Sequence, residues 1–218
     1  MKDLYREKFQ THAAEVGGVC GEIDHVISHI KKWAKDEVVD TALFMGPATS
    51  IVRPEPLGVV CMMGTWNFPF LLTFNPLSNI IAAGNCVLVK PSEIAPHCSA
   101  VIAKIITESL DQRFYRVIEG KSKVAITLNK QKFDLFMFTG STQKGKLVAE
   151  AAAKNLVPCV LELGGKSPVI VDIDADSTFA AKKVLVGKLA NFGQVCMAPD
   201  YVLCHESKVE TFMTALKT

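Results

Sequence analysis

The segment TGSTQKGKL, residues 139–147, follows the strand-like run DLFMF (134–138) and leads into the helical pattern KLVAEAAAK (146–154). Its glycines allow a tight turn. The first N–H groups of the following helix have no partner inside it, so they can bind an anion. The segment therefore predicts a strand–turn–helix unit with a phosphate-binding turn.

Two other interpretations of this segment stay open. Gly140 to Lys146 matches the P-loop pattern GxxxxGK, and Asp172 ends a strand-like run that would present a magnesium-binding carboxylate. Against this, Leu147 stands where a P-loop needs a Ser or Thr hydroxyl on the metal. The pattern GxGxxG does not occur in the chain, and an ordinary strand-to-helix turn would also explain Gly140.

Short apolar runs typical of strands alternate with helical patterns on both sides of this segment. This order predicts an α/β fold with a parallel sheet and crossover helices. The expected strands include 86–90, 114–118, 134–138, 157–163 and 167–174, and the expected helices include 99–110 and 176–191.

The N-terminal part of the chain predicts a separate helical layer. Apolar residues at positions 19, 23, 26, 27, 30 and 33 lie on one face of a helix. A stretch rich in Pro and Gly follows, so we expect a boundary near residues 45–57.

Composition and charge exclude several classes of function. The chain has 24 basic and 22 acidic residues, a net charge of +2, and no long run of one sign, so nucleic acid is not an expected partner. Seven cysteines without metal-ligand spacing indicate reduced thiols and no metal site. No apolar run reaches the roughly 18 residues of a membrane span, and the charged N-terminus is unlike a signal peptide. We therefore expect a soluble, cytoplasmic protein.

A second cofactor-binding candidate is LVKPSE, residues 88–93. Lys90 ends a predicted strand at the edge where open α/β sheets bind ligands, and Glu93 follows three residues later. Both side chains would face a ribose. The alternative is that Lys90 is a solvated surface charge.

Three residues would together support attack on an aldehyde or acyl group, which needs a thiolate, an oxyanion hole and a base. Cys196 follows a predicted helix, and we expect it to be the exposed, reactive cysteine of the seven. Glu162 ends an apolar strand before two glycines, so we expect burial to suit it for general-base work. The Asn67 side chain would donate a hydrogen bond to an oxyanion. Each also has a plain alternative: a packing thiol, a solvent-facing carboxylate and a turn residue.

Seven motifs in the chain resemble those of the aldehyde dehydrogenase superfamily, in the same order. They are PEPLGVV, GTWNFPF, AAGN, KPSE, FTGSTQKGK, LELGGKSP and GQVCMAPDYVL. The resemblance runs from about residue 18 to the C-terminus, and APDYVL and AAAKNLVP are most similar to the class 3 branch, which handles fatty and aromatic aldehydes. Val195 and Phe68 depart from the usual Thr and Tyr of the family.

This resemblance implies three parts of the fold. They are an N-terminal helical segment (1–45), a Rossmann-like NAD-binding domain (46–162) and the beginning of an α/β catalytic domain (163–218). Family members are roughly twice as long, so a second hypothesis is a truncated or degenerate fragment that keeps the nucleotide fold without turnover.

The resemblance also implies the roles of individual residues. Cys196 would attack the aldehyde, Asn67 and the Cys196 N–H would hold the oxyanion, and Glu162 would activate water to hydrolyse the thioester. NAD is the expected cofactor, with NADP as an alternative, and full-length relatives are expected to be homodimers. The expected cofactor-binding residues are Thr65, Trp66, Lys90, Glu93, Gly140, Ser141, Thr142, Gly145, Leu163 and Gly164.

Overall fold

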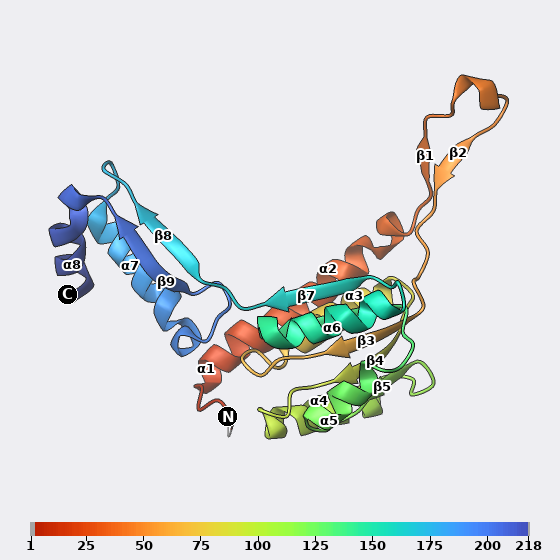
Figure 1. Ribbon diagram of the computed structural model, residues 1–218, viewed down its shortest axis with the longest axis horizontal. Helices are drawn as coiled ribbons and strands as arrows, with labels where there is room; N and C mark the ends of the chain where they lie inside the picture. Colours follow the sequence, from red (N-terminus) through yellow and green to blue (C-terminus); the bar gives the residue numbers. More distant parts are fainter. Residues whose placement is uncertain (1–2, 218) are drawn as a thin grey trace. The chain divides into compact units, whose positions relative to one another are not determined.

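The computed structural model describes residues 3–217 and contains two compact units, Met1–Leu161 and Glu162–Thr218. Each unit is an arrangement of helices and parallel strands (Figure 1), which confirms the predicted α/β fold class. The three-part division expected from the sequence, with boundaries at 45/46 and 162/163, stays a prediction.

The first unit contains most of the helices and strands. In chain order they are α1 (Lys8–Thr11), a π-helical turn (His12–Val16), α2 (Gly17–Trp33), β1 (Glu37–Val39), β2 (Ser50–Val52), β3 (Val59–Met63), α3 (Leu71–Ala82), β4 (Cys86–Lys90), α4 (Pro96–Ser109), β5 (Tyr115–Val117), α5 (Ser122–Leu128), β6 (Leu135–Gly140), α6 (Thr142–Lys154) and β7 (Cys159–Leu163).

The central sheet has the strand order β5-β4-β3-β6-β7. β3 pairs in parallel with β4 and β6, and β4 pairs in parallel with β5. Met63 lies opposite both Lys90 and Phe138, so the carboxyl ends of three strands meet at one edge. The strand order reverses at β3, and open α/β sheets bind ligands at such a point.

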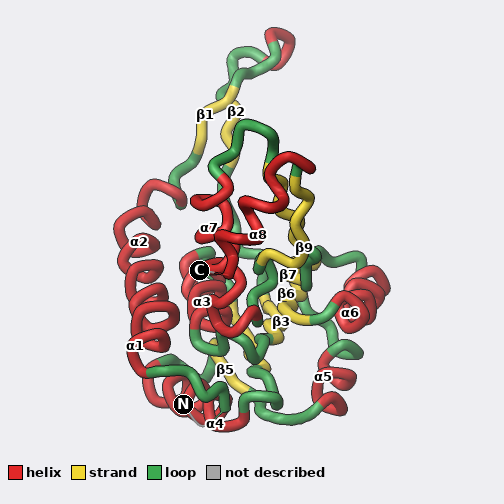
Figure 2. Tube along the Cα trace, turned by 90° about the vertical axis from the view of Figure 1, so that its left-hand side faces the viewer, coloured by secondary structure: helices red, strands yellow, loops and turns green. Residues whose placement is uncertain are grey.

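The core of the first unit lies on both faces of this sheet. Val60 and Met62 of β3 pack with α3 and α4 in one hydrophobic cluster. Side chains alternate along a strand, so buried Cys61 and Phe136 of the register pair β3–β6 face the other side. Figure 2 shows α2 and α3 on one side of the strands and α5 and α6 on the other.

The second unit is a β–α–β arrangement with an added C-terminal helix. β8 (Ser167–Val171) and β9 (Pro199–Cys204) pair in parallel, α7 (Ser177–Leu189) joins them, and α8 (Val209–Lys217) follows. Asp176 is the N-cap of α7, and its carboxylate accepts hydrogen bonds from the N–H groups of Thr178 (2.9 Å) and Phe179 (3.0 Å). Figure 1 shows α7 beside the two strands.

The sequence-based helix over 19–33 and the strand over 86–90 are confirmed as α2 and β4. Two features were not predicted. An antiparallel hairpin, β1 with β2, reaches into the stretch expected to be a boundary. Helix α3 contains Pro76, which usually disfavours a helix interior, yet Leu77 and Ile80 of the same helix are buried in the core.

Candidate active site

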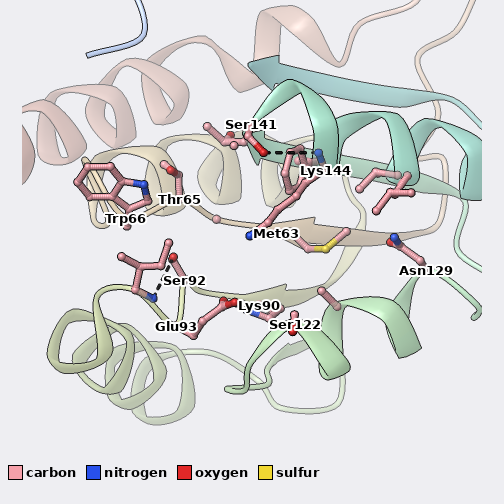
Figure 3. A pocket seen from close by; sticks show the side chains of 18 of the residues that line it. Met63, Thr65, Trp66, Lys90, Ser92, Glu93, Ser122, Asn129, Ser141 and Lys144 are labelled. Carbon is pink, nitrogen blue, oxygen red and sulfur yellow. Dashed lines mark hydrogen bonds and ion pairs between the residues drawn. The ribbon is translucent and has the colours of Figure 1, made fainter. Parts of the chain in front are cut away.

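A pocket of about 270 Å³ lies at the carboxyl edge of β3, β4 and β6. The turn after β3, the end of β4 and the turn between β6 and α6 form it, together with residues of α5 (Figure 3). It therefore occupies the place where the strand order reverses. Six of the residues predicted to bind cofactor line it: Thr65, Trp66, Lys90, Glu93, Gly140 and Ser141.

Lys90 and Glu93 form an ion pair in this pocket. Lys90 is buried, with its Nζ 2.8 Å from Glu93 Oε2 and 3.0 Å from the carbonyl oxygen of Pro91. The alternative that Lys90 is a solvated surface charge is therefore wrong. Burial by itself raises the pKa of the Glu93 carboxyl, but the Lys90 hydrogen bond and charge outweigh it, so this pKa lies below its usual range. The carboxylate is ionised at neutral pH and can accept hydrogen bonds from a ribose.

The turn between β6 and α6 offers N–H groups to an anion. Ser141 is the N-cap of α6, and its Oγ accepts a hydrogen bond from the Lys144 N–H at 3.5 Å. The N–H groups of Thr142 and Gln143 have no acceptor inside the helix. A Cβ at Gly140 would lie 2.5 Å from Cζ of buried Phe138, so the close approach of this turn requires glycine. The turn therefore fits a phosphate group.

Other predicted cofactor residues lie outside the pocket. Gly145 is buried in α6 and donates its N–H to the Ser141 carbonyl at 2.9 Å, so that group is engaged within the helix. Thr142 does not line the pocket, although it begins α6. Lys146, the lysine of the P-loop alternative, does not line the pocket either, whereas Leu147 does. The position of these two side chains disfavours the P-loop interpretation.

The Asn67 loop is held on both sides by hydrogen bonds. The Asn67 Oδ1 accepts from the Thr65 hydroxyl at 3.2 Å, and its backbone carbonyl accepts from Arg6 Nη2 at 2.5 Å. The first of these bonds orients the side-chain amide, whose other end is the Nδ2 donor. Asn67 itself does not line the pocket.

Arg6 belongs to a buried ion pair that also fixes the start of α3. Its partner Glu15 is fully buried, and the Glu15 Oε2 accepts from the N–H groups of Phe70 (2.7 Å) and Leu71 (3.3 Å). These N–H groups begin a helix and lack acceptors within it, so Glu15 caps α3 from another part of the chain. Sequence reasoning missed both residues, because it used the N-terminal charges only as an argument against a signal peptide. The carboxylate inside the apolar stretch AAEV was the available signal.

Strand β7 begins in the first unit and ends in the second, so Glu162 is the first residue of the second unit, which also contains Cys196. Ser167 of β8 pairs with Pro199 of β9, so the segments that precede the two strands lie side by side. A Cβ at Gly165 would lie 2.6 Å from the carbonyl oxygen of Cys196, so only glycine permits this approach. The turn that follows Glu162 therefore contacts the Cys196 backbone.

The predicted burial of Glu162 is wrong. Residues of β7 alternate between half-buried and exposed, and Glu162 has an exposed position. Leu163 is half-buried and Gly164 is exposed, and neither lines the pocket of the first unit. Because Glu162 is exposed, its carboxylate is accessible to water.

The turn before Cys196 has an unusual backbone. Asn191 (φ 49°) and Phe192 (φ 57°) are in the left-handed region, which costs a non-glycine residue on the order of 1–3 kcal/mol. Two amide hydrogen bonds hold the turn: Asn191 Nδ2 donates to the Gln194 carbonyl (3.2 Å), and Gln194 Nε2 donates to the Asn191 carbonyl (3.0 Å). Such strain persists only where surrounding contacts enforce it, and these bonds fix the turn that presents Cys196.

Thiol labelling should separate the cysteines by burial. Cys196 is exposed, but so is Cys20 on α2, so exposure alone does not distinguish Cys196, and the expectation that it alone is both exposed and prone to ionise stays a prediction. Burial raises the pKa values of Cys61 and Cys98 to about 12, with the hydrogen bond to Asp3 adding to the rise at Cys98. These two thiols stay protonated until the pH approaches that value. At about pH 8, near the usual thiol pKa, we expect iodoacetamide to modify Cys196 and Cys20 first.

Peptide mass spectrometry after short reaction times measures this order. A Cys20→Ser variant simplifies the pattern to one fast site. Modification of Cys61 or Cys98 as fast as Cys196 would contradict the burial seen here.

Within residues 3–217, no three His, Cys, Asp or Glu side chains are grouped so as to hold a metal ion. No helix of the described chain combines the length and apolar character that crossing a bilayer requires.

A parallel sheet with a pocket and a helix N-terminus at the point where the strand order reverses is typical of nucleotide-binding α/β proteins. The sequence profile described as "Aldehyde dehydrogenase family" matches residues 6–218. The chain therefore belongs to the aldehyde dehydrogenase family.

Individual relatives agree with this assignment. The chain is 42% identical to the dimeric, NADP-preferring aldehyde dehydrogenase of Rattus norvegicus, over 99% of this chain and 48% of that protein. The substrate-bound AldH of Staphylococcus aureus superposes with a TM-score of 0.96 at 42% identity, over 99% of this chain and 47% of the other. A Mycobacterium tuberculosis aldehyde dehydrogenase complexed with NAD+ superposes with a TM-score of 0.88 at 27% identity, over 99% of this chain and 44% of the other. The chain thus spans about half the length of these relatives.

Proposed function

We propose that this chain carries the cofactor pocket and the nucleophile of an enzyme that oxidises an aldehyde to a carboxylic acid with NAD or NADP. The observation that carries the proposal is the pocket at the carboxyl edge of the sheet, where buried Lys90, paired with half-buried Glu93, faces a helix N-terminus. Family membership supplies the reaction class.

The pocket residues fit a dinucleotide. Glu93 is ionised and can accept hydrogen bonds from the two hydroxyls of the adenosine ribose, with Lys90 beside it. The N-terminus of α6, with Ser141, would hold the pyrophosphate. Thr65 and Trp66 line the same pocket, and by family resemblance Leu163 and Gly164 would lie near the nicotinamide. When bound, the nicotinamide supplies the hydride acceptor.

The proposed nucleophile is Cys196. Its sulfur would form a bond to the aldehyde carbon, and the carbonyl electrons would move to oxygen, where the Asn67 side chain and the Cys196 N–H stabilise the negative charge. Loss of hydride from that carbon leaves a thioester on Cys196. The two amide hydrogen bonds in the turn before Cys196 support this role, because they fix the backbone of the turn that leads to this residue.

Glu162 is proposed as the base that completes the cycle. Its exposed carboxylate would take a proton from water, and the resulting hydroxide would attack the thioester carbon. The carbon–sulfur bond then breaks, which releases the acid and returns the thiol.

For the whole protein we propose NAD as the preferred cofactor, because the Glu93 carboxylate repels a 2′-phosphate. The name of the rat relative supports acceptance of NADP and a homodimer. The free cysteines Cys20, Cys61, Cys86, Cys98, Cys159, Cys196 and Cys204 support a reducing, cytoplasmic location.

The test is to purify the chain, measure NAD binding by calorimetry, and follow NADH formation with a medium-chain aldehyde and with benzaldehyde. We expect NAD to bind to the chain and both aldehydes to yield NADH with the whole protein, but little or no NADH with the 218-residue chain alone, because misplacing the reacting groups by about 1 Å costs on the order of a hundredfold in rate. NAD binding without NADH in the whole protein would instead favour a nucleotide-binding fold without turnover. Magnesium-dependent ATP hydrolysis that Lys146→Ala abolishes would favour the P-loop alternative.

A further inference from the structure

Lys144 is a cation of the pocket that the proposed reaction does not use. It lies in the first turn of α6 and lines the pocket from the side opposite Lys90 and Glu93 (Figure 3). Its position is exposed. Within residues 3–217, Lys144 forms no ion pair with a carboxylate, whereas Lys90 is paired with Glu93. The flexible, strongly hydrated ammonium of Lys144 therefore lies across the pocket from Lys90 and Glu93, the pair proposed to bind the ribose.

We propose that Lys144 binds the 2′-phosphate of NADP and thereby allows this pocket to accept NADP as well as NAD. The inference rests on the proposed function, because it takes the adenosine ribose to lie at Lys90 and Glu93. It adds a residue that determines which of the two cofactors binds.

The charges around the ribose show why a second cation is needed. A 2′-phosphate on a ribose held by Glu93 would lie close to an ionised carboxylate, which repels it. Lys90 balances the charge of Glu93, so the ion pair has no net positive charge to offer a 2′-phosphate, and two of the three donors of the Lys90 ammonium are engaged by Glu93 Oε2 and the Pro91 carbonyl. Lys144 is the other lysine of the pocket lining.

The reach of Lys144 supports this assignment. Its positive charge acts on the Glu93 carboxyl and contributes to the lowering of that pKa, after the larger effects of burial and of Lys90. Lys144 and Glu93 also line the same pocket, so a ribose phosphate bound beside Glu93 would lie in the space that the Lys144 side chain borders. The long side chain can extend toward that phosphate from the first turn of the helix.

The same lysine has one competing use, which is binding of the pyrophosphate at the helix N-terminus. The two uses differ in the ligand that they favour. A lysine on the pyrophosphate strengthens binding of every nucleotide with a 5′-phosphate, whereas a lysine on the 2′-phosphate strengthens only the 2′-phosphorylated ones.

The experiment is calorimetric titration of the 218-residue chain with two probes, 5′-AMP and adenosine 2′,5′-bisphosphate. In Lys144→Met, which keeps the length of the stem, we expect adenosine 2′,5′-bisphosphate to bind about fivefold to tenfold more weakly, as for loss of one charge-assisted contact. Binding of 5′-AMP should change by less than about twofold, because that probe lacks the contacted group. Lys146→Met is the matched control, since Lys146 is on the same helix but outside the pocket; it should leave both probes unchanged.

Glu93→Gln provides an independent test in the opposite direction. Removing the carboxylate should strengthen binding of adenosine 2′,5′-bisphosphate, and adding Lys144→Met should reverse that gain. Equal weakening of both probes by Lys144→Met would place the lysine on the 5′-phosphate and overturn the inference. An unchanged affinity for adenosine 2′,5′-bisphosphate would overturn it as well. Failure of both probes to bind the unsubstituted chain would instead contradict the cofactor pocket of the proposed function, and this inference with it.

Discussion

Replacing Glu15 by alanine is expected to lower the free energy of unfolding by about 3–5 kcal/mol, the usual result of removing one partner from a buried ion pair. The substitution leaves the Arg6 guanidinium buried without its carboxylate. It also removes the acceptor for the N–H groups of Phe70 and Leu71. The start of α3 and the Asn67 carbonyl, which Arg6 holds, should both loosen.

Urea denaturation followed by tryptophan fluorescence measures this effect, because both tryptophans, Trp33 and Trp66, lie in the same unit as Glu15. A double variant, Arg6→Met with Glu15→Leu, should recover a large part of the loss, since no charge is then left buried without a partner. Asp36→Asn is the matched control. It breaks the solvent-exposed Arg53–Asp36 pair, so stability should hardly change. A Glu15→Ala variant as stable as this control would show that the buried pair is unimportant.

The parts of the fold that sequence reasoning predicted are those with strong local signals. Strand β6, the turn at Gly140 and helix α6 were predicted together, because an apolar run, glycines and a helical pattern follow one another along the chain. The start of α7 at Asp176 was predicted on similar grounds. Lys90 and Glu93 were selected because strand ends of parallel sheets bind ligands.

Features that depend on distant contacts were not predictable from local pattern. Helix α3 contains Pro76, and its stability comes from burial of Leu77 and Ile80 and from Glu15, a residue far away in the sequence. The burial of Glu162 was wrongly expected from the apolar residues around it, whereas the side chains of β7 alternate between half-buried and exposed, and Glu162 has an exposed position. Lys144 was overlooked because only the three-dimensional arrangement places it across from Glu93.

In the candidate site, motifs identified residue types but not their supports. The sequence named Cys196 and Asn67 and could not name what holds them. In the structure, Gly165 lies against the Cys196 carbonyl, and Asn191 and Gln194 hydrogen-bond to each other across the turn that precedes Cys196. These supports are backbone approaches and amide bonds, which leave no spacing pattern in the sequence.

Replacing Cys196 by serine is expected to reduce aldehyde-dependent NADH formation on the order of a thousandfold or more, as for loss of a catalytic nucleophile. A serine hydroxyl ionises far less readily than a thiol, so the attacking species is nearly absent at neutral pH. Cys20→Ser is the matched control, because Cys20 is the other exposed cysteine and lies on α2, outside the cofactor pocket. This variant should keep its turnover. NAD affinity, measured by calorimetry, should be unchanged in both variants, which separates loss of chemistry from loss of folding.

Intact mass after reaction with a thiol-reactive aldehyde gives a second readout that needs no turnover. The fast adduct should disappear in Cys196→Ser and persist in Cys20→Ser. If Cys196→Ser still produced NADH at the original rate, or if the fast adduct depended on Cys20 instead, the nucleophile would have to be a different residue.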